Sequence, residues 1–261
     1  MHINTEYFAG PANCPHNLVL IHGWGICSRI FYPLVPLLQK YCNVTLLDLP
    51  GYGINHQIPA NRCDGIQKIL EETLPNNIIL LGWSLGVTLA LRYTITNPNK
   101  VKGLITCAGS PRFCADPTSS WPGTEATLLQ KFASILKMDN CNSIIDKFLS
   151  LQAMGSETLK QDIRTMKKLI AEVETPSYYE LQAGLKTLMD EDLRGYISRI
   201  TCPSLHIYGA RDRLVPATSA QIWHQKANAK ICIMPASSHA PFITEPKNFA
   251  QEIASFLQNL K

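Results

Sequence analysis

Residues 78–93 read IILLGWSLGVTLALRY and predict a strand, a sharp turn and a helix. The apolar run 78–81 is too short for a helix and predicts a buried strand, while apolar residues at helical spacing follow the turn. The turn is Gly82-Trp83-Ser84-Leu85-Gly86, a G-x-S-x-G pentapeptide that is typical of a serine held in a strained conformation above a sheet. Its two glycines avoid the collision that a Cβ would make with the neighbouring strand and helix.

The composition indicates one compact α/β domain. The chain has 261 residues, of which 46% are hydrophobic and 17% charged, enough to bury a large core. A net charge of +4 without an arginine-rich run argues against nucleic acid as a partner. We find no apolar stretch of 18 residues and no leader pattern, so we expect a cytoplasmic protein without a membrane span. The nine cysteines include no C-x-x-C pair, and we expect free thiols in a reducing compartment and no metal site.

The rest of the chain alternates predicted strands and helices. Further strands are predicted at 17–21, 44–49, 101–108, 203–209 and 229–234. Further helices are predicted at 28–41, 64–74, 216–226 and 246–260. Because the strands show no alternating polar face and helices separate them, we predict a mostly parallel sheet covered by helices on both faces.

One long segment interrupts this alternation. Residues 110–188 contain no convincing strand pattern. Four helices are predicted there, at 124–138, 140–152, 156–173 and 177–188. We therefore predict a core made of 1–109 and 189–261, with an all-helical lid inserted between two strands of the sheet.

A serine at such a turn needs a base and an acid to become a nucleophile. In this architecture the order along the chain is serine, acid and histidine, with the acid and the histidine in loops at the carboxyl ends of strands. Asp212 and His239 follow the last two predicted strands and fit this order with Ser84. Asp116 is a competing acid, but it lies further from the end of its strand. The sequence therefore predicts Ser84, Asp212 and His239 as a catalytic triad.

The other histidines fit the role of the base less well. His206 lies inside a predicted strand and is expected in the core. His22 precedes a glycine-rich turn, which we expect it to shape. His224 lies on a predicted helix. The remaining three lie in predicted loops or tails and have no partner: His2, His16 and His56.

The oxyanion that forms on an attacked carbonyl requires two fixed N–H donors. One is the backbone N–H of Leu85, directly after the serine. The other comes from the loop after the strand at 17–21, where the N–H of Trp24 in His22-Gly23-Trp24-Gly25 is the natural donor. The indole of Trp24 would also form a wall of the acyl pocket. The alternative is that Trp24 is an ordinary core residue.

Several segments carry a resemblance to a known family. They are His22-Gly23-Trp24-Gly25, Asp48-Leu49-Pro50-Gly51-Tyr52-Gly53, Gly82-Trp83-Ser84-Leu85-Gly86, Trp121-Pro122-Gly123, Phe148-Leu149-Ser150-Leu151-Gln152-Ala153-Met154-Gly155 and His239-Ala240-Pro241-Phe242. Together they resemble the pimeloyl-acyl carrier protein methyl ester esterases of biotin synthesis, over nearly the whole chain. The expected fold is then an α/β-hydrolase fold with the helical lid inserted after the sixth sheet strand.

The resemblance implies a reaction and a partner. The chain would be a monomeric serine carboxylesterase, with no metal or cofactor, that hydrolyses the methyl ester of pimeloyl-acyl carrier protein to pimeloyl-acyl carrier protein and methanol. By the family pattern, the residues that contact the substrate are Trp24, Ser84, Leu85, Phe148, Leu149, Ser150, Leu151, Gln152 and His239. From its spacing alone, the lid run 148–152 would be the amphipathic core face of a helix.

Acyl carrier proteins are acidic, so a docking surface for them should be basic. Lys160, Arg164, Lys167 and Lys168 share one face of the predicted helix 156–173, since they stand at i, i+4, i+7 and i+8, and Lys147 lies on the helix before it. Lys147, Lys160 and Arg164 match basic lid sites of the family. Another family arginine position is occupied by Ser143, so the docking charge is reduced or moved to Lys167 and Lys168. The alternative is an ordinary solvated face.

Three rival functions remain open. A general short-acyl carboxylesterase or thioesterase would use the same triad, because fold does not determine substrate. A non-catalytic binding protein on the hydrolase fold would keep the pocket but carry a silent triad. A haloperoxidase or carbon–carbon hydrolase is a further alternative.

Overall fold

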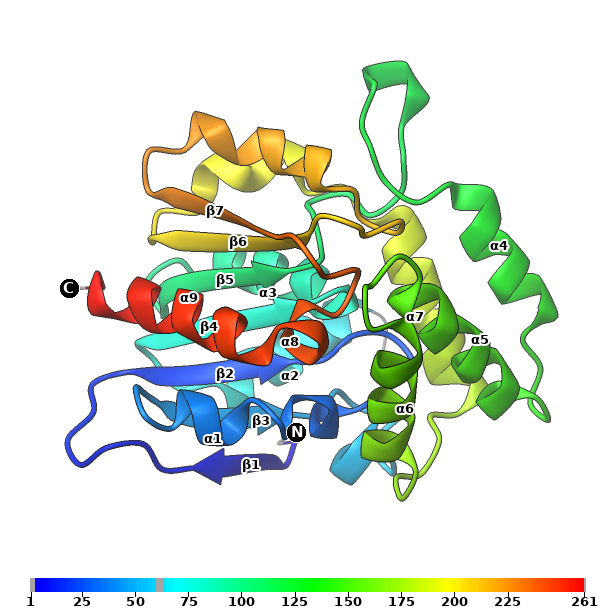
Figure 1. The fold of residues 1–261 in the computed structure, drawn as a ribbon, viewed down its shortest axis with the longest axis horizontal. Coiled ribbons are helices and arrows are strands. Elements are labelled where there is room, and N and C mark those ends of the chain that lie inside the picture. Colours follow the sequence, from blue (N-terminus) through cyan, green and yellow to red (C-terminus); the bar gives the residue numbers. More distant parts are fainter. Residues whose placement is uncertain (1–2, 60–62, 261) are drawn as a thin grey trace.

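The computed structural model describes residues 3–59 and 63–260 (Figure 1). Its strands are β1 (Thr5–Phe8), β2 (Asn17–Ile21), β3 (Asn43–Leu47), β4 (Ile78–Trp83), β5 (Val101–Cys107), β6 (Ser204–Gly209) and β7 (Ala229–Met234). Its α-helices are α1 (Val35–Leu38), α2 (Cys63–Thr73), α3 (Leu85–Thr96), α4 (Ala126–Ile135), α5 (Cys141–Ala153), α6 (Leu159–Ile170), α7 (Tyr178–Asp190), α8 (Pro241–Thr244) and α9 (Pro246–Gln258). Short 3₁₀ helices are η1 (Ser28–Phe31), η2 (Gly53–Asn55), η3 (Pro117–Ser119), η4 (Arg194–Arg199) and η5 (Ala217–Gln225).

The strands form one sheet in the order β1-β3-β2-β4-β5-β6-β7. The strands from β2 to β7 pair in parallel, as predicted, and only β1 runs antiparallel, next to β3. The sequence did not predict β1, since its four residues are at most half-buried and show no apolar run. The parallel order brings the carboxyl ends of six strands to one edge, where loops can converge.

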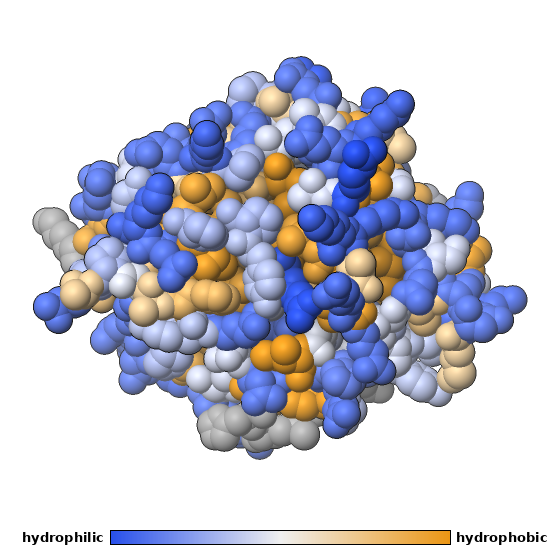
Figure 2. All heavy atoms as spheres, turned by 60° about the horizontal axis from the view of Figure 1, so that its bottom comes forward, coloured by the Kyte–Doolittle hydropathy of each residue, from blue (hydrophilic) through white to orange (hydrophobic). Residues whose placement is uncertain are grey.

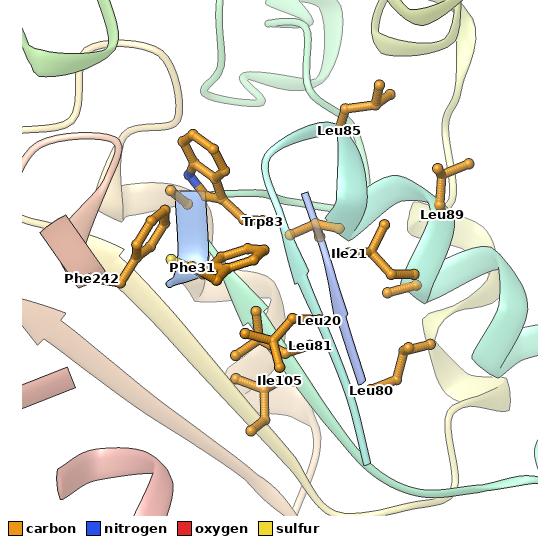
Figure 3. Packing of buried hydrophobic residues seen from close by; sticks show 14 of the residues in the cluster. Leu20, Ile21, Phe31, Leu80, Leu81, Trp83, Leu85, Leu89, Ile105 and Phe242 are labelled. Carbon is orange, nitrogen blue, oxygen red and sulfur yellow. The ribbon is translucent and has the colours of Figure 1, made fainter. Parts of the chain in front are cut away.

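Helices cover both faces of this sheet (Figure 1). Helices α1, α8 and α9 lie on one face, and α2 and α3 lie on the other. Figure 3 shows that side chains of β4 alternate between the two faces of the sheet. Leu81 and Trp83 point toward Phe31 and Phe242, whereas Leu80 points to the side of α3. All six residues of β4 are buried, which explains why its sequence is uninterruptedly apolar.

The lid consists of α4 to α7 and lies beyond the carboxyl ends of the parallel strands (Figure 1). The expectation of six strands before the lid is wrong, since in the described residues five strands, β1 to β5, precede it. The segment 9–16 between β1 and β2 is a turn, closed by the bond from Cys14 N–H to the Pro11 carbonyl.

Two predicted helices differ from the structure. The range 28–41 contains η1, a turn and the short α1, because Pro33 and Pro36 supply no N–H to an α-helical ladder. The range 216–226 contains η5, a run of 3₁₀ turns with bonds such as Lys226 N–H to the Trp223 carbonyl.

The structure shows the state of the cysteines and the lengths of the apolar helices. Eight cysteines have free thiols in the structure, and six of these are buried. The ninth, Cys63, has a side chain outside the described part. No helix of the described ranges is long and apolar enough to cross a membrane.

Candidate active site

The turn between β4 and α3 holds Ser84 in a strained conformation, with φ 55° and ψ −117°. Backbone strain of this kind costs about 1–3 kcal/mol and needs support from its surroundings. Here the support is a close backbone approach. A Cβ on Gly82 would lie 2.3 Å from the Gly86 carbonyl oxygen, and a Cβ on Gly86 would lie 2.3 Å from that of Ile21. The steric reason predicted for both glycines is therefore confirmed.

Ser84, His239 and Asp212 form one chain of hydrogen bonds. His239 Nε2 lies 2.9 Å from Ser84 Oγ, and His239 Nδ1 lies 2.8 Å from Asp212 Oδ2. Since an ionised carboxylate can only accept, Nδ1 carries the proton and Nε2 is the acceptor for the serine hydroxyl. Ser84 and His239 have no exposed surface. The pairing joins the loops after β6 and β7 to the turn after β4.

The other carboxylate oxygen of Asp212 is also held. Its Oδ1 accepts the backbone N–H groups of Leu214, at 2.8 Å, and Val215, at 3.0 Å. These bonds fix the orientation of the carboxylate and aim Oδ2 at the imidazole.

The structure does not bring the competing acid, Asp116, to Ser84 and His239. Asp116 pairs with Arg194 at 3.0 Å, and bonds from Thr118, Ser119 and Arg194 hold the pKa of its carboxyl well below the usual range. Of the two acids that the sequence offered, only Asp212 reaches the imidazole of His239.

The loop after β2 lies directly against Ser84. A Cβ on Gly23 would approach the Ser84 Cβ to 3.2 Å, so the glycine lets the loop come this close. His22 shapes the loop as expected: its Nδ1 bonds the Gly23 carbonyl at 2.8 Å, and its Nε2 accepts the Leu49 N–H at 3.0 Å. Burial lowers the pKa of His22 and keeps its ring neutral. Trp24, the next residue, is thereby held beside the serine.

The lid covers this loop. The Trp24 indole N–H donates to the Leu181 carbonyl of α7 at 2.8 Å, and its ring meets that of Phe148 of α5 edge to face at 4.8 Å. Both side chains are about 1% exposed. A cleft of about 330 Å³ lies between this loop and the lid, lined by Gly25 on one side and by lid residues such as Ile145 on the other.

The lid run 148–152 divides between two faces of α5. Phe148, Leu149 and Gln152 are buried, and the Gln152 carbonyl accepts the His239 N–H at 3.2 Å. Leu151 is half-buried. Ser150 is exposed, and its hydroxyl donates to the Asp146 carbonyl within the helix. The structure therefore does not bring Ser150 to the triad, because its position on the helix turns it to the outer face.

Two contacts at the site were not predicted from the sequence. The Trp83 indole donates to the His239 carbonyl at 2.7 Å, and the ring of Phe113 stands edge-on to the imidazole, 6.3 Å away. The Gln152 side chain has no exposed surface, yet among the described residues neither its oxygen nor its nitrogen has a hydrogen-bond partner. An unpaired buried amide costs about 1–3 kcal/mol, so packing alone does not account for this side chain.

The predicted docking cations lie on the outer surface of the lid. Lys147, Lys160, Arg164 and Lys168 are exposed. Lys167 is paired with Asp146 of α5 at 3.0 Å. Arg164 and Lys168 line a groove of about 460 Å³ together with Arg29 of η1, a cation that the sequence analysis did not single out.

The described residues contain no group of three or more histidine, cysteine, aspartate or glutamate side chains that could hold a metal ion. The chemistry that the site can perform with its own groups is nucleophilic attack by a serine, assisted by an imidazole and a carboxylate.

Comparison with known proteins agrees with this geometry. The family profile described as alpha/beta hydrolase fold matches residues 17–246, and fold and site together define the chain as an α/β hydrolase. The chain is 39% identical to the pimeloyl-[acyl-carrier protein] methyl ester esterase of Photobacterium profundum over 244 residues, which is 93% of this chain and 94% of the relative. It is 37% identical to the protein of the same name from Wigglesworthia glossinidia brevipalpis, with 93% of each chain covered. The chain belongs to this esterase family.

A solved structure supports the same fold. The esterase EaEST from Exiguobacterium antarcticum superposes with a TM-score of 0.81, covering 98% of this chain and 95% of that one. Its sequence is 22% identical, so this likeness concerns the fold alone.

Proposed function

We propose that the chain is a serine carboxylesterase that hydrolyses the methyl ester of pimeloyl-acyl carrier protein, releasing methanol and pimeloyl-acyl carrier protein for biotin synthesis. The observation that carries this proposal is the unbroken chain of hydrogen bonds from Asp212 through His239 to Ser84 beneath the lid. The names of relatives that align over 93% of the chain support the choice of substrate.

The mechanism follows from the positions of the protons. Ser84 Oγ attacks the ester carbonyl while His239 Nε2 removes its proton, and Asp212 stabilises the imidazolium that forms. The backbone N–H groups of Leu85 and Trp24 stabilise the oxyanion. His239 then gives its proton to the departing methoxide, and methanol leaves. A water molecule activated by His239 hydrolyses the acyl-enzyme and frees the carboxylate.

The lid supplies the environment for this substrate. Trp24 and Phe148 form apolar walls suited to an acyl chain, and they shield Ser84 from water. The amide of Gln152, without a partner among the described residues, would bind a polar group of the chain such as the ester; the carbonyl of the same residue accepts the His239 N–H. The cleft of about 330 Å³ begins at Gly25, next to Trp24, and we propose that the arm from the carrier protein would enter there.

We further propose that the carrier docks on the basic outer side of α6. Figure 2 shows the face turned up from below Figure 1, where hydrophilic side chains surround small hydrophobic patches. Lys147, Lys160 and Arg164 belong to the docking surface, and the groove adds Lys168 and Arg29. Lys167 contributes less, because Asp146 already balances its charge. Acidic carrier proteins match this surface in sign.

A charge reversal tests the docking surface. Arg164→Glu together with Lys168→Glu should raise the KM for pimeloyl-acyl carrier protein methyl ester by ~10-fold or more, as like charges would face an acidic carrier. Turnover of a small p-nitrophenyl ester should not change. Lys40→Glu, an exposed reversal before β3 and away from the lid, is the matched control. A double variant with the same KM as this control would exclude docking on α6.

The binding-protein alternative has its own test. A fluorophosphonate labels only an activated serine, so the native chain should react and Ser84→Ala should not. An unlabelled native chain would favour the silent triad.

The proposal also includes a location and an oligomeric state: the enzyme would be a monomer in the cytoplasm. The eight free thiols support a reducing compartment.

A further inference from the structure

A second buried carboxylate lies in the lid, outside the triad. Asp162 of α6 is 4% exposed. Its Oδ2 accepts the hydroxyls of Ser156, at 2.5 Å, and Thr244, at 2.7 Å, and its Oδ1 accepts that of Thr158, at 2.7 Å. No lysine, arginine or histidine of the described ranges pairs with it. A buried carboxylate that only hydroxyls solvate is costly to keep, so packing alone does not account for it.

One of the three hydroxyls belongs to the segment that carries the catalytic base. Thr244 ends α8, the single-turn helix that starts two residues after His239, and its N–H bonds the Ala240 carbonyl at 3.3 Å. The hydrogen bond between the Thr244 hydroxyl and Asp162 therefore restrains the backbone immediately after His239. Ser156 and Thr158 lie in the turn that leads into α6. The Thr158 hydroxyl connects Asp162 to this turn, whereas the Ser156 hydroxyl also lies 3.4 Å from Thr244 Oγ1.

The segment from Gln152 to Glu157, which connects α5 to α6, also forms hydrogen bonds with the loop that carries His239. The Ser238 hydroxyl donates to the Met154 carbonyl at 2.7 Å, the Glu157 N–H donates to the Ala236 carbonyl at 3.2 Å, and the His239 N–H bonds Gln152. Together with Asp162 and Thr244, these contacts fasten the loop of His239 to the lid on both sides of the imidazole.

Helix α6 thus has two roles on its two faces. Lys160 and Arg164 stand two residues on either side of Asp162, on the exposed surface proposed for carrier docking, whereas Asp162 faces inward. We propose that Asp162 is a positioning residue for His239, acting through Thr244, and that it couples the docking helix to the catalytic base. The coupling to docking rests on the function proposed above, but the positioning of His239 does not.

The test compares variants that each remove one hydroxyl from the same carboxylate. Thr244→Val should lower kcat by ~10-fold with KM unchanged, because a small displacement of the base slows proton transfer without altering binding. Thr158→Val is the matched control and should stay within about twofold of the native kcat, and Thr244→Ser should restore turnover. Each variant is assayed with a p-nitrophenyl ester and with pimeloyl-acyl carrier protein methyl ester, and its Tm is measured. If Thr244→Val is too unstable, Thr244→Ala replaces it.

Each outcome decides the proposal. A selective loss of kcat in Thr244→Val at a Tm equal to that of Thr158→Val supports positioning. Native kcat in Thr244→Val, or an equal loss in both variants, overturns it. The p-nitrophenyl ester reports on His239 without any carrier, so the result stands even if the biotin substrate is wrong. Failure of the proposed function would be seen separately, as a native enzyme that cleaves the small ester and leaves the carrier ester intact.

Discussion

Two buried histidines, His206 and His239, occupy neighbouring parts of the molecule and differ in their partners. His206 lies inside β6, between Thr106 Oγ1 at 2.8 Å and Ser204 Oγ at 2.9 Å, and stacks on Trp223 with ring centroids 3.6 Å apart. His239 lies in the loop after β7, between a carboxylate and the hydroxyl of Ser84. Neither has any exposed surface.

The difference shows that burial does not by itself make a catalytic base. Burial, aided by the charge of Lys226, lowers the pKa of His206 well below its usual value, so this ring remains neutral and structural. At His239 the carboxylate of Asp212 can stabilise the imidazolium that forms during catalysis. The comparison predicts that disturbing the partners of the two histidines has very different consequences.

The largest effect is expected when the carboxylate partner is neutralised. Asp212→Asn should reduce kcat by ~10³–10⁴-fold, because the amide favours the wrong imidazole tautomer and does not stabilise its charged form. The matched change at the other histidine, Thr106→Val, should leave kcat within about twofold. Steady-state kinetics on a small ester would measure both. A comparable loss of kcat in both variants would refute the distinction.

A smaller effect concerns stability and pH. The pKa of His206 is depressed in the folded state, so below the unfolded value of about 6.5 the unfolded chain binds more protons and stability falls as pH falls. Between pH 7 and pH 5 this should cost up to about 2 kcal/mol. His206→Gln should lose correspondingly less over the same interval. Urea unfolding of both proteins at the two pH values would measure the difference, and identical losses would contradict it.

The smallest effect is expected at Gln152, whose buried side-chain amide has no hydrogen-bond partner among the described residues. Gln152→Met should raise the free energy of unfolding by about 1 kcal/mol, since it removes an unsatisfied amide. It should also lower kcat/KM for the carrier ester by ~10-fold, because the binding group is lost. Thermal unfolding and kinetics on one preparation would test both. Unchanged kcat/KM would exclude Gln152 from substrate binding.

The sequence predicted most of the residues at the carboxyl edge of the sheet, because their positions follow from short-range sequence patterns. Gly82 and Gly86 are required by close backbone contact, and Asp212 and His239 stand at short distances after strand ends. By contrast, the edge strand β1 has no apolar run that would reveal it. The helix predicted over 28–41 is divided in the structure, because Pro33 has no N–H to donate to the hydrogen-bond ladder.

The lid was harder to predict, because its contacts are tertiary. A run of five residues cannot all face the site from one helix, so Ser150 turns outward although the family pattern includes it. The partners of Asp162 come from two segments far apart in sequence, since Ser156 in the turn before α6 and Thr244 at the end of α8 are 88 residues apart. No spacing rule connects such positions, and only the assembled structure brings them together.

The most direct test of the account is methanol release from pimeloyl-acyl carrier protein methyl ester by the native chain and by Ser84→Ala. The native chain should release methanol and leave the thioester to the carrier intact, and Ser84→Ala should be slower by at least ~10⁴-fold. A native chain that cleaves a small p-nitrophenyl ester but not this substrate would contradict the biotin assignment. Equal methanol release by both proteins would contradict the assignment of Ser84 as the nucleophile.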